Sequence, residues 1–230
     1  MQRKSVIVAA KRTPVGAFQG HLSSISSPDL AAVAIKHILG ETRIQPDQID
    51  EIILGNVLTA GQGQAPARQA ALNSGCPNSV EALTINKMCG SGLKAVMLAD
   101  QAIRCGDADT VLAGGMESMS NAPYLLKNAR GGQRLGHGTM IDSMIHDGLW
   151  DVYSNKHMGT CAEMLAADRH YSREAQDAYA IESYRRAQDA QAKGVFKSEI
   201  VPVEVPQRKG DPVIIKEDEE PGKAQFDKIP

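Results

Sequence analysis

The sequence has few aromatic residues, no large charge imbalance and no long apolar run. Aromatic side chains make up 4% of the 230 residues, so the core must be built mainly from Ala, Val, Ile, Leu and Met. No run approaches the roughly 20 apolar residues that span a membrane. The net charge of −2 gives no reason to expect a nucleic-acid or membrane partner. We therefore expect a globular protein of one large or two modest domains.

The four cysteines lack the close spacing of a metal or redox site. No Cys-x-x-Cys pair occurs among Cys76, Cys89, Cys105 and Cys161, and zinc and thioredoxin-type sites usually show such pairs. Free thiols are typical of a reducing compartment, and the first residues show no signal or transit features. We expect a cytoplasmic protein with free thiols and no metal site.

Apolar runs and amphipathic segments alternate over residues 1–119. The expected strands are 5–10, 51–58, the run that ends before Cys89, and 110–113. The expected helices are 27–39, with Ser27 as cap and Gly40 as stop, then 65–74 and 93–104. The run at 5–10 is continuously apolar after Ser5, which is typical of a strand buried on both faces. This alternation predicts an α/β fold with a parallel sheet and helices on its faces.

The pattern changes near residue 120. Residues 121–156 show no sustained period and are rich in glycine, and long irregular segments in compact proteins are usually functional. Helices are expected up to about Arg169 and then, with Ser172 as cap, to about Lys193. Two strands, 198–205 and 212–216, follow around a turn. We therefore divide the chain into a layered domain, 1–119, and a second domain, 120–230.

Cys89 stands where an apolar run meets the start of a helix. Gly90-Ser91-Gly92 follows directly and allows a sharp turn and the close approach of a substrate. The unpaired N–H groups and the dipole of a helix N-terminus favour the thiolate, which is the reactive form of cysteine. Cys89 is thus a candidate nucleophile for acyl transfer. The alternative is that it packs as a small buried hydrophobic residue.

A second conspicuous segment, Gly114-Gly115-Met116-Glu117, also follows an expected strand. Loops at the carboxyl ends of parallel strands commonly carry the chemistry of such sheets. Glu117 therefore either supports a site next to Cys89 or forms a buried ion pair in a tight turn. The sequence leaves both interpretations open.

Five motifs, in this order along the chain, resemble those of the thiolases, and specifically of the acetyl-CoA acetyltransferases. They are Val-Ala-Ala-Lys-Arg-Thr-Pro-Val-Gly at 8–16, Gly-Gln-Gly-Gln-Ala-Pro-Ala-Arg-Gln-Ala at 61–70, Asn-Lys-Met-Cys-Gly-Ser-Gly-Leu-Lys at 86–94, Gly-Gly-Met-Glu-Ser-Met-Ser at 114–120 and His-Met-Gly-Thr at 157–160. The resemblance covers residues 1–230. It implies a thiolase-like layered αβα N-terminal domain with an inserted loop domain that covers the active site and binds coenzyme A.

The resemblance also implies a reaction. Two acetyl-CoA molecules would condense reversibly to acetoacetyl-CoA and CoA through an acetyl-Cys89 intermediate, with the N–H of Cys89 helping to hold the oxyanion. Coenzyme A thioester is then the substrate, and no covalently bound cofactor is expected. The complete enzyme would be a homotetramer, a dimer of dimers.

Six further residues match family positions that contact coenzyme A: Leu149, His157, Met158, Tyr184, Lys223 and Lys228. The first three match the pantetheine slot and the acyl pocket, and Met158 resembles a residue that restricts the acyl group to short chains. The two lysines match the nucleotide end, although family members often have Arg where Lys223 stands, and Lys stacks less well on adenine. Acidic neighbours make a solvated surface the alternative for these lysines.

Tyr184 matches a tyrosine that, in the mitochondrial-type enzymes, lies at a coenzyme A site stabilised by potassium. The alternative is an ordinary half-buried tyrosine on a helix. The resemblance therefore leaves a potassium site near Tyr184 open.

Three segments of the family do not occur in the sequence: Gly-His-Pro, Cys-x-Gly-Gly and Asn-Glu-Ala-Phe. In thiolases they carry the activating histidine, a second acid/base cysteine and part of an oxyanion hole, all in the C-terminal half. We therefore expect an N-terminal part without the C-terminal domain, either a truncated product or a subunit completed by a C-terminal-half polypeptide. A catalytically incompetent CoA-binding or assembly fragment stays open, and a ketoacyl synthase is a third, weaker possibility.

Overall fold

A three-stranded parallel sheet forms the centre of the first half of the chain in the computed structural model, which describes residues 3–229. The strands lie in the order β2–β1–β3, with bounds Glu81–Ile85, Glu51–Gly55 and Val111–Gly115. Their register pairs Gly55 with both Ile85 and Gly115, so the carboxyl ends of all three strands meet at one edge. The predicted parallel pairing is confirmed.

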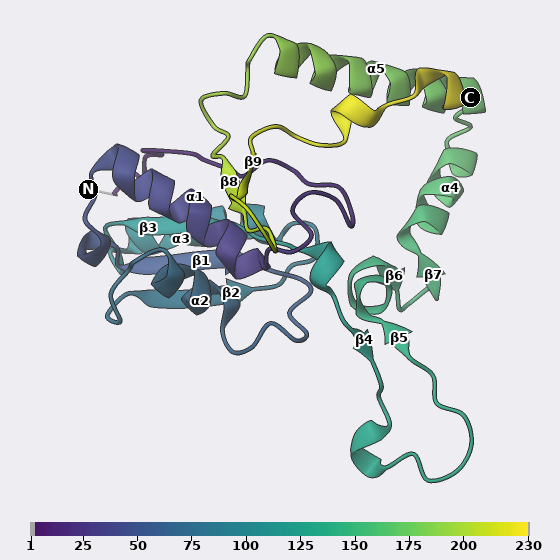
Figure 1. Ribbon diagram of the computed structural model, residues 1–230, viewed down its shortest axis with the longest axis horizontal. Coiled ribbons are helices and arrows are strands. Elements are labelled where there is room, and N and C mark those ends of the chain that lie inside the picture. Colours follow the sequence, from purple (N-terminus) through teal and green to yellow (C-terminus); the bar gives the residue numbers. More distant parts are fainter. Residues whose placement is uncertain (1–2, 230) are drawn as a thin grey trace.

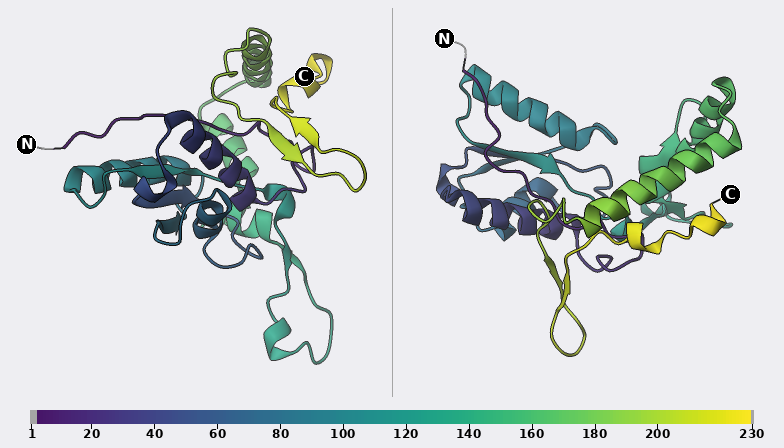
Figure 2. Two further views of the ribbon diagram at one scale, coloured as in Figure 1. Left: turned by 60° about the vertical axis from the view of Figure 1, so that its left-hand side comes forward. Right: turned by 90° about the horizontal axis from the view of Figure 1, so that it is seen from above.

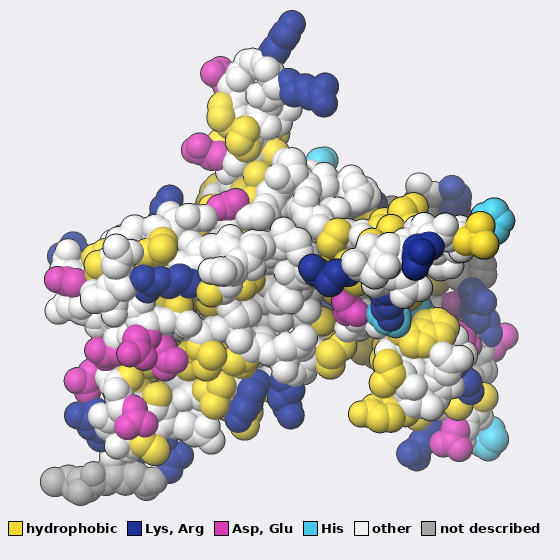
Figure 3. Space-filling view, turned by 90° about the horizontal axis from the view of Figure 1, so that it is seen from below, with side chains coloured by type: hydrophobic (Ala, Val, Ile, Leu, Met, Phe, Trp, Pro, Cys, Tyr) yellow, Lys and Arg dark blue, Asp and Glu magenta, His cyan; other side chains and the backbone are white. Residues whose placement is uncertain are grey.

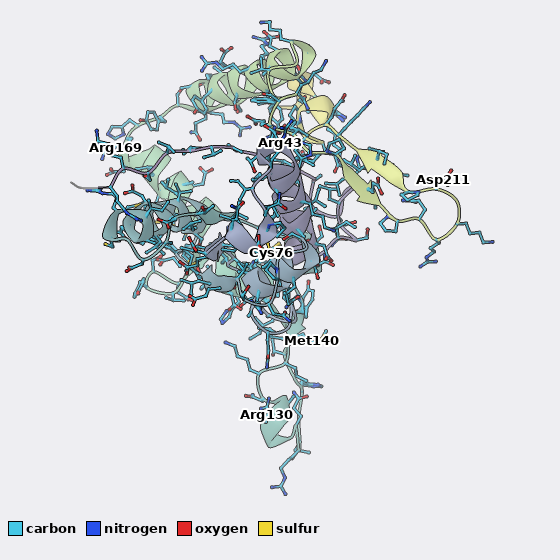
Figure 4. All side chains as sticks on the ribbon, turned by 90° about the vertical axis from the view of Figure 1, so that its left-hand side faces the viewer. Arg43, Cys76, Arg130, Met140, Arg169 and Asp211 are labelled. Atoms are coloured by element: carbon cyan, nitrogen blue, oxygen red, sulfur yellow. The ribbon has the colours of Figure 1, made fainter. Side chains whose placement is uncertain are left out.

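Helices cover both faces of this sheet (Figures 1 and 2). Helices α1 (Ser27–Thr42) and α2 (Pro66–Asn73) pack on one face, and α3 (Ser91–Cys105) packs on the other. The main core lies between the sheet and α1 and α2, where Ile52 and Ala67 are fully buried and Cys76 is enclosed (Figure 4). The layered α/β arrangement is therefore confirmed, with helices on both sides.

The ends of α1 differ slightly from the prediction. Ser26, rather than Ser27, caps the helix by accepting the N–H of Asp29. Gly40 does not end the helix, which continues to Thr42 and closes on Arg43 in the left-handed conformation. A glycine ends a helix when the backbone needs a positive φ there, and here Arg43 adopts that conformation instead.

The N-terminal segment is the main departure from the prediction. Residues 5–10 are extended but belong to no strand, and Val6 and Ile7 are 77% and 82% exposed. Side chains tether the segment, since Arg3 pairs with Asp109 and Ser5 donates to Asp100 on α3. An apolar run becomes a buried strand only where neighbouring strands can pair with it, and no described strand does so. The prediction of a buried strand at 5–10 is wrong for this structure.

The middle of the chain is largely irregular, as predicted for residues 121–156. Short strands form two hairpins: β4 (Tyr124–Leu125) with β5 (Ile141–Asp142), and β6 (Trp150–Asp151) with β7 (Lys156–His157). A π-helix, Met144–Leu149, joins the two hairpins. The loop that links β4 to β5 carries Arg130 and Met140 and projects far from the body (Figure 4).

The last third of the chain follows the prediction more closely. Helices α4 (Met158–Asp168) and α5 (Arg173–Ala192) form, and Ser172 caps α5 as predicted. Strands β8 (Val203–Val205) and β9 (Val213–Ile215) pair antiparallel and are shorter than expected. Their hairpin projects from the body with Lys and Arg side chains at its end (Figure 3). The described residues also contain short 3-10 helices at Pro46–Gln48, Met119–Asn121, Ala129–Gly131, Pro221–Lys223 and Phe226–Lys228.

A group of charged side chains, which we call the clasp, joins the start of the chain to its last third: Arg12, Glu199, Asp218, Glu219 and Lys223. The Arg12 guanidinium donates to Glu199 and, through both terminal nitrogens, to Asp218. The Glu219 carboxylate accepts the N–H groups of Ala17 and His21 and pairs with Lys223 at 2.6 Å. Because the Glu219 side chain is only 4% exposed, these bonds replace its water.

We predict that the clasp makes the stability of the protein depend on pH in acid. The bond from Lys223 and the two backbone N–H groups lower the pKa of Glu219 from 4.5 to about 2. The contribution of this carboxylate is therefore complete above its unfolded pKa and is lost as the pH falls from about 4.5 to about 2. The destabilisation caused by Glu219→Gln should shrink over that window. Melting temperatures at a series of pH values, with the exposed Glu204→Gln as control, measure this. A difference that stays constant across the window would contradict the prediction.

Candidate active site around Cys89

Cys89 lines a cavity of about 400 Å³ at the carboxyl edge of the sheet. Residues that follow β1, β2 and β3 form one side, and the π-helix forms the other. Most lining side chains are apolar, among them Val57, Leu58, Met88, Met119, Met144 and Leu149. The thiol is exposed, so the alternative of a buried packing cysteine is wrong for this structure. The predicted position between a strand and a helix is confirmed, while its role as nucleophile remains a prediction.

A tight turn presents Cys89. Met88 adopts a positive φ of 49°, which is unfavourable for a residue with a side chain. Three hydrogen bonds hold this turn: Met88 N–H donates to Asn86 Oδ1, Lys87 N–H donates to Ser91 Oγ, and Ser91 Oγ donates to the Met88 carbonyl. Because the buried Ser91 both accepts and donates, it fixes the position of the residue that precedes the thiol.

We predict that Ser91→Ala destabilises the protein and loosens this turn. The substitution removes both bonds of the hydroxyl and leaves the Lys87 N–H without its acceptor, which should cost about 1–3 kcal/mol of unfolding free energy. Urea unfolding of the variant measures the change. Ser183→Ala, on the exposed side of α5, is the matched control and should change stability by less than about 0.5 kcal/mol. Equal unfolding midpoints for the two variants would count against a role for the hydroxyl.

Glycines bring the start of α3 into backbone contact with the strands. A Cβ on Gly55 would lie 2.5 Å from Ser91 Cβ and 2.8 Å from Gly92 N, closer than any real contact. A Cβ on Gly115 would lie 3.2 Å from Gly92 Cα. The helix start therefore sits directly on the ends of β1 and β3. The turn that carries Cys89 is fixed relative to the sheet by this close approach.

Glu117 reaches across the sheet edge from the loop after β3. Its carboxylate accepts the N–H groups of Val57 at 2.9 Å and Leu58 at 3.1 Å, and Asn56 Nδ2 at 2.7 Å. Within residues 3–229 it forms no ion pair, and its side chain is exposed and lines the cavity. The interpretation as a buried ion pair is therefore wrong. Glu117 instead supports the cavity wall.

Two further residues support the site without having been predicted from the sequence to do so: Asn56 and Ser91. Asn56 directly follows β1, as Cys89 and Glu117 follow β2 and β3, so the rule that indicated those two residues could have indicated Asn56 as well. Its amide is 1% exposed and also donates to the Met116 carbonyl. Apart from its place next to Cys89, no sequence pattern indicates that Ser91 pairs with the turn.

Of the residues matched to coenzyme A contacts, only Leu149 lines the described Cys89 cavity. His157 lies on β7, and its Nδ1 accepts the Gly159 N–H and so caps α4. Met158 is the first residue of α4 and is 42% exposed. The structure therefore places His157 and Met158 one hairpin away from Leu149.

Tyr184, Lys223 and Lys228 lie on α5 and the segment beside it (Figure 1). Lys223 is paired with Glu219 and Glu220, at 2.6 and 3.6 Å, so acids already neutralise the position matched to the adenine contact. Within residues 3–229, no group of three or more His, Cys, Asp or Glu side chains is placed to hold a metal ion. The potassium site near Tyr184 remains a prediction.

Comparisons with known proteins agree with the sequence motifs. The family described as thiolase, N-terminal domain, matches residues 5–229. An acetyl-CoA acetyltransferase of Allochromatium vinosum is 54% identical over 96% of the chain and 56% of its own length. An acetyl-CoA acetyltransferase of Cupriavidus necator is 56% identical over 93% of the chain and 54% of its own length. The chain thus spans about half the length of the curated relatives that it matches.

A solved structure shows the same fold. The Acat5 thiolase of Ascaris suum, in complex with coenzyme A, superposes with a TM-score of 0.92 and is 40% identical. The match covers 99% of this chain and 57% of the Ascaris chain. Within residues 3–229, no helix is both long and apolar enough to cross a membrane.

Proposed function

The chain belongs to the thiolase family, and we propose that it supplies the nucleophile and the acyl pocket of an acetyl-CoA C-acetyltransferase. The reaction is the reversible condensation of two acetyl-CoA molecules to acetoacetyl-CoA and CoA. The observation that carries the proposal is the exposed Cys89 thiol, which stands on a rigid turn inside an apolar cavity. The names of the curated relatives support acetyl-CoA as the substrate.

In the first half-reaction, the Cys89 thiolate attacks the thioester carbonyl of acetyl-CoA. The bond from carbon to the CoA sulfur breaks, CoA leaves as the thiolate, and acetyl-Cys89 remains. The N–H of Cys89, close to the start of α3, helps to hold the oxyanion formed on the way. A cavity of about 400 Å³ lined by apolar side chains accommodates a short acyl group and the end of the pantetheine arm.

The second half-reaction needs a base that removes an α-proton from another acetyl-CoA. Among the described residues of the cavity, the only carboxylate is Glu117, which already accepts three N–H groups, and no imidazole lines the wall. We propose that proton transfer is supplied by further residues, in the same protein or in a second polypeptide. The matched region covers 56% and 54% of the two curated relatives, so each relative has further residues outside it.

We further propose that residues 1–119 form the core domain and residues 120–230 the loop domain of this enzyme. The loop domain would bind coenzyme A through Leu149, His157, Met158, Tyr184, Lys223 and Lys228. The complete enzyme would be a cytoplasmic homotetramer. The projecting loop between β4 and β5 is available for contacts between subunits.

Mass spectrometry after incubation with acetyl-CoA tests the proposal. We expect no acetyl adduct on the chain alone and an adduct on Cys89 once the part of the Cupriavidus necator relative that follows the matched region is added as a second polypeptide. Cys105, also exposed, is the internal control and should stay unmodified. An adduct on the chain alone would show that Cys89 needs no added base. No adduct under either condition would favour the second candidate, a CoA-binding or assembly fragment without catalysis.

A further inference from the structure

We propose that Glu117 is a positioning residue that sets the width of the Cys89 cavity by fixing residues 56–58, which we call the strap. The identity of this cavity as an acyl pocket rests on the proposed function above. The position of its wall rests only on the contacts of the strap. By setting this width, Glu117 selects acyl groups by size.

Glu117 takes the place of a missing strand neighbour. Strand β1 ends at Gly55, so the N–H groups of Val57 and Leu58 lie beyond the ladder that pairs the sheet. Both donate to the Glu117 carboxylate. A carboxylate only accepts and has room for several donors, so one side chain satisfies a segment that the sheet leaves unpaired.

The strap in turn determines where the opposite wall can lie. A Cβ on Gly148 would lie 3.2 Å from Leu58 Cδ2, so the leucine side chain packs directly against the π-helix backbone. Leu58, Gly148 and Leu149 all line the cavity. If the strap moves, the contact that spaces the π-helix from the sheet moves with it, and the width of the cavity changes.

The orientation of the Asn56 side chain also depends on the Glu117 carboxylate. Its Nδ2 donates to Glu117 and to the Met116 carbonyl, while its Oδ1 is buried and is the only such side-chain atom without a hydrogen-bond partner within residues 3–229. Leaving a buried amide oxygen unpaired is costly. The amide is therefore oriented to donate to Glu117 at the expense of its own acceptor.

Alkylation of Cys89 by a small and a bulky reagent tests the role of Glu117. The rates of reaction with iodoacetamide and with N-phenylmaleimide are measured by peptide mass in the 230-residue protein, each relative to Cys105 in the same molecule. In E117A we expect the rate of the bulky reagent to rise about threefold relative to that of the small one, because the strap loses its hydrogen bonds to a charged acceptor. The matched control is E204Q, whose side chain is exposed on β8 and should leave both ratios unchanged.

E117Q separates fixing the strap from filling space. Glutamine keeps the size of the side chain and one acceptor oxygen. Its NH₂ group, however, cannot accept the hydrogen bond that the second carboxylate oxygen accepts from a backbone N–H. We expect the rate of the bulky reagent relative to the small one to rise as in E117A, but by less. If E117Q behaves like the wild type while E117A opens the cavity, Glu117 acts by its bulk and the proposal is wrong. Ratios unchanged in both variants overturn it as well.

The proposed acetyl transfer and the proposed role of Glu117 can be disproved independently of each other. Alkylation needs no thioester, so the reagent ratios report on the cavity wall even where acetyl-CoA leaves Cys89 unmodified. If E117A loses its folded circular dichroism spectrum, E117Q decides the result. Acetylation of Cys89 without any change of the ratios would leave the proposed function intact and remove the role of Glu117.

Discussion

If the chain has the proposed function, replacing Cys89 with serine is expected to abolish acetyl transfer once the chain is completed with the C-terminal part of the Cupriavidus necator relative, as in the acetylation test. Removal of a nucleophile typically lowers kcat by about 10⁴-fold or more, because the covalent route is lost and only binding and oxyanion stabilisation remain. Serine keeps the shape of the side chain, but its hydroxyl stays protonated and is a far weaker nucleophile than a thiolate. Spectroscopic measurement of acetoacetyl-CoA cleavage by CoA gives the rate.

The matched control is Cys105→Ser. Cys89 and Cys105 are both exposed and stand near opposite ends of the same helix, since α3 begins at Ser91 and ends at Cys105. Loss of a thiol at the far end should leave the rate within about twofold of the wild type, as expected for a surface substitution away from the site. A Cys89→Ser enzyme that retains substantial activity would show that acetyl transfer does not pass through this thiol.

Replacing Gly55 with alanine is expected to produce a large loss of stability and to disturb the site as well. The added methyl group would lie within 2.8 Å of three atoms of Ser91 and Gly92, two of which are backbone atoms that cannot rotate away. Such overpacking typically costs about 1–3 kcal/mol, and here the start of α3 must shift. Cys89 stands on that start, so its alkylation rate should change together with the unfolding midpoint.

Gly40→Ala provides the opposite control. Gly40 lies within α1, and a Cβ there would meet no atom within 4 Å. Alanine restricts the unfolded chain more than glycine and should stabilise this helix by about 0.5–1 kcal/mol. Urea unfolding of both variants compares the two glycines. If Gly55→Ala matched or exceeded the wild type in stability, the close approach of α3 to β1 would not be a constraint.

The parts of the fold that local pattern determines could be predicted from the sequence. Helices α2 and α3 and the three paired strands carry their own periodicity and end signals, so their existence and the parallel pairing of the strands followed from the alternation of elements. The position of Cys89 followed in the same way, because a strand run, a glycine pair and a helix pattern meet there. These features depend on residues close together in the chain.

The parts that depend on distant partners could not be predicted. Residues 5–10 have the composition of a buried strand but lie exposed, since composition does not supply a neighbouring strand. Glu117 finds its donors about sixty residues earlier, in the strap. Five of the six residues matched to coenzyme A contacts lie on β7, α4, α5 and the final segment and do not line the cavity. No pattern of neighbouring residues predicts how segments so far apart in the sequence are placed.

The residues that pair in the clasp are synthesised far apart in time. Arg12 and Asp218 are 206 positions apart, and Ala17 and Glu219 are 202 apart. At about 5–20 residues per second, a ribosome needs roughly 10–40 s to add the residues between them. The sheet and α1–α3 can form during that time from contacts within the first half. Arg12 and Ala17, by contrast, can pair with Asp218 and Glu219 only after the latter two residues have left the ribosome.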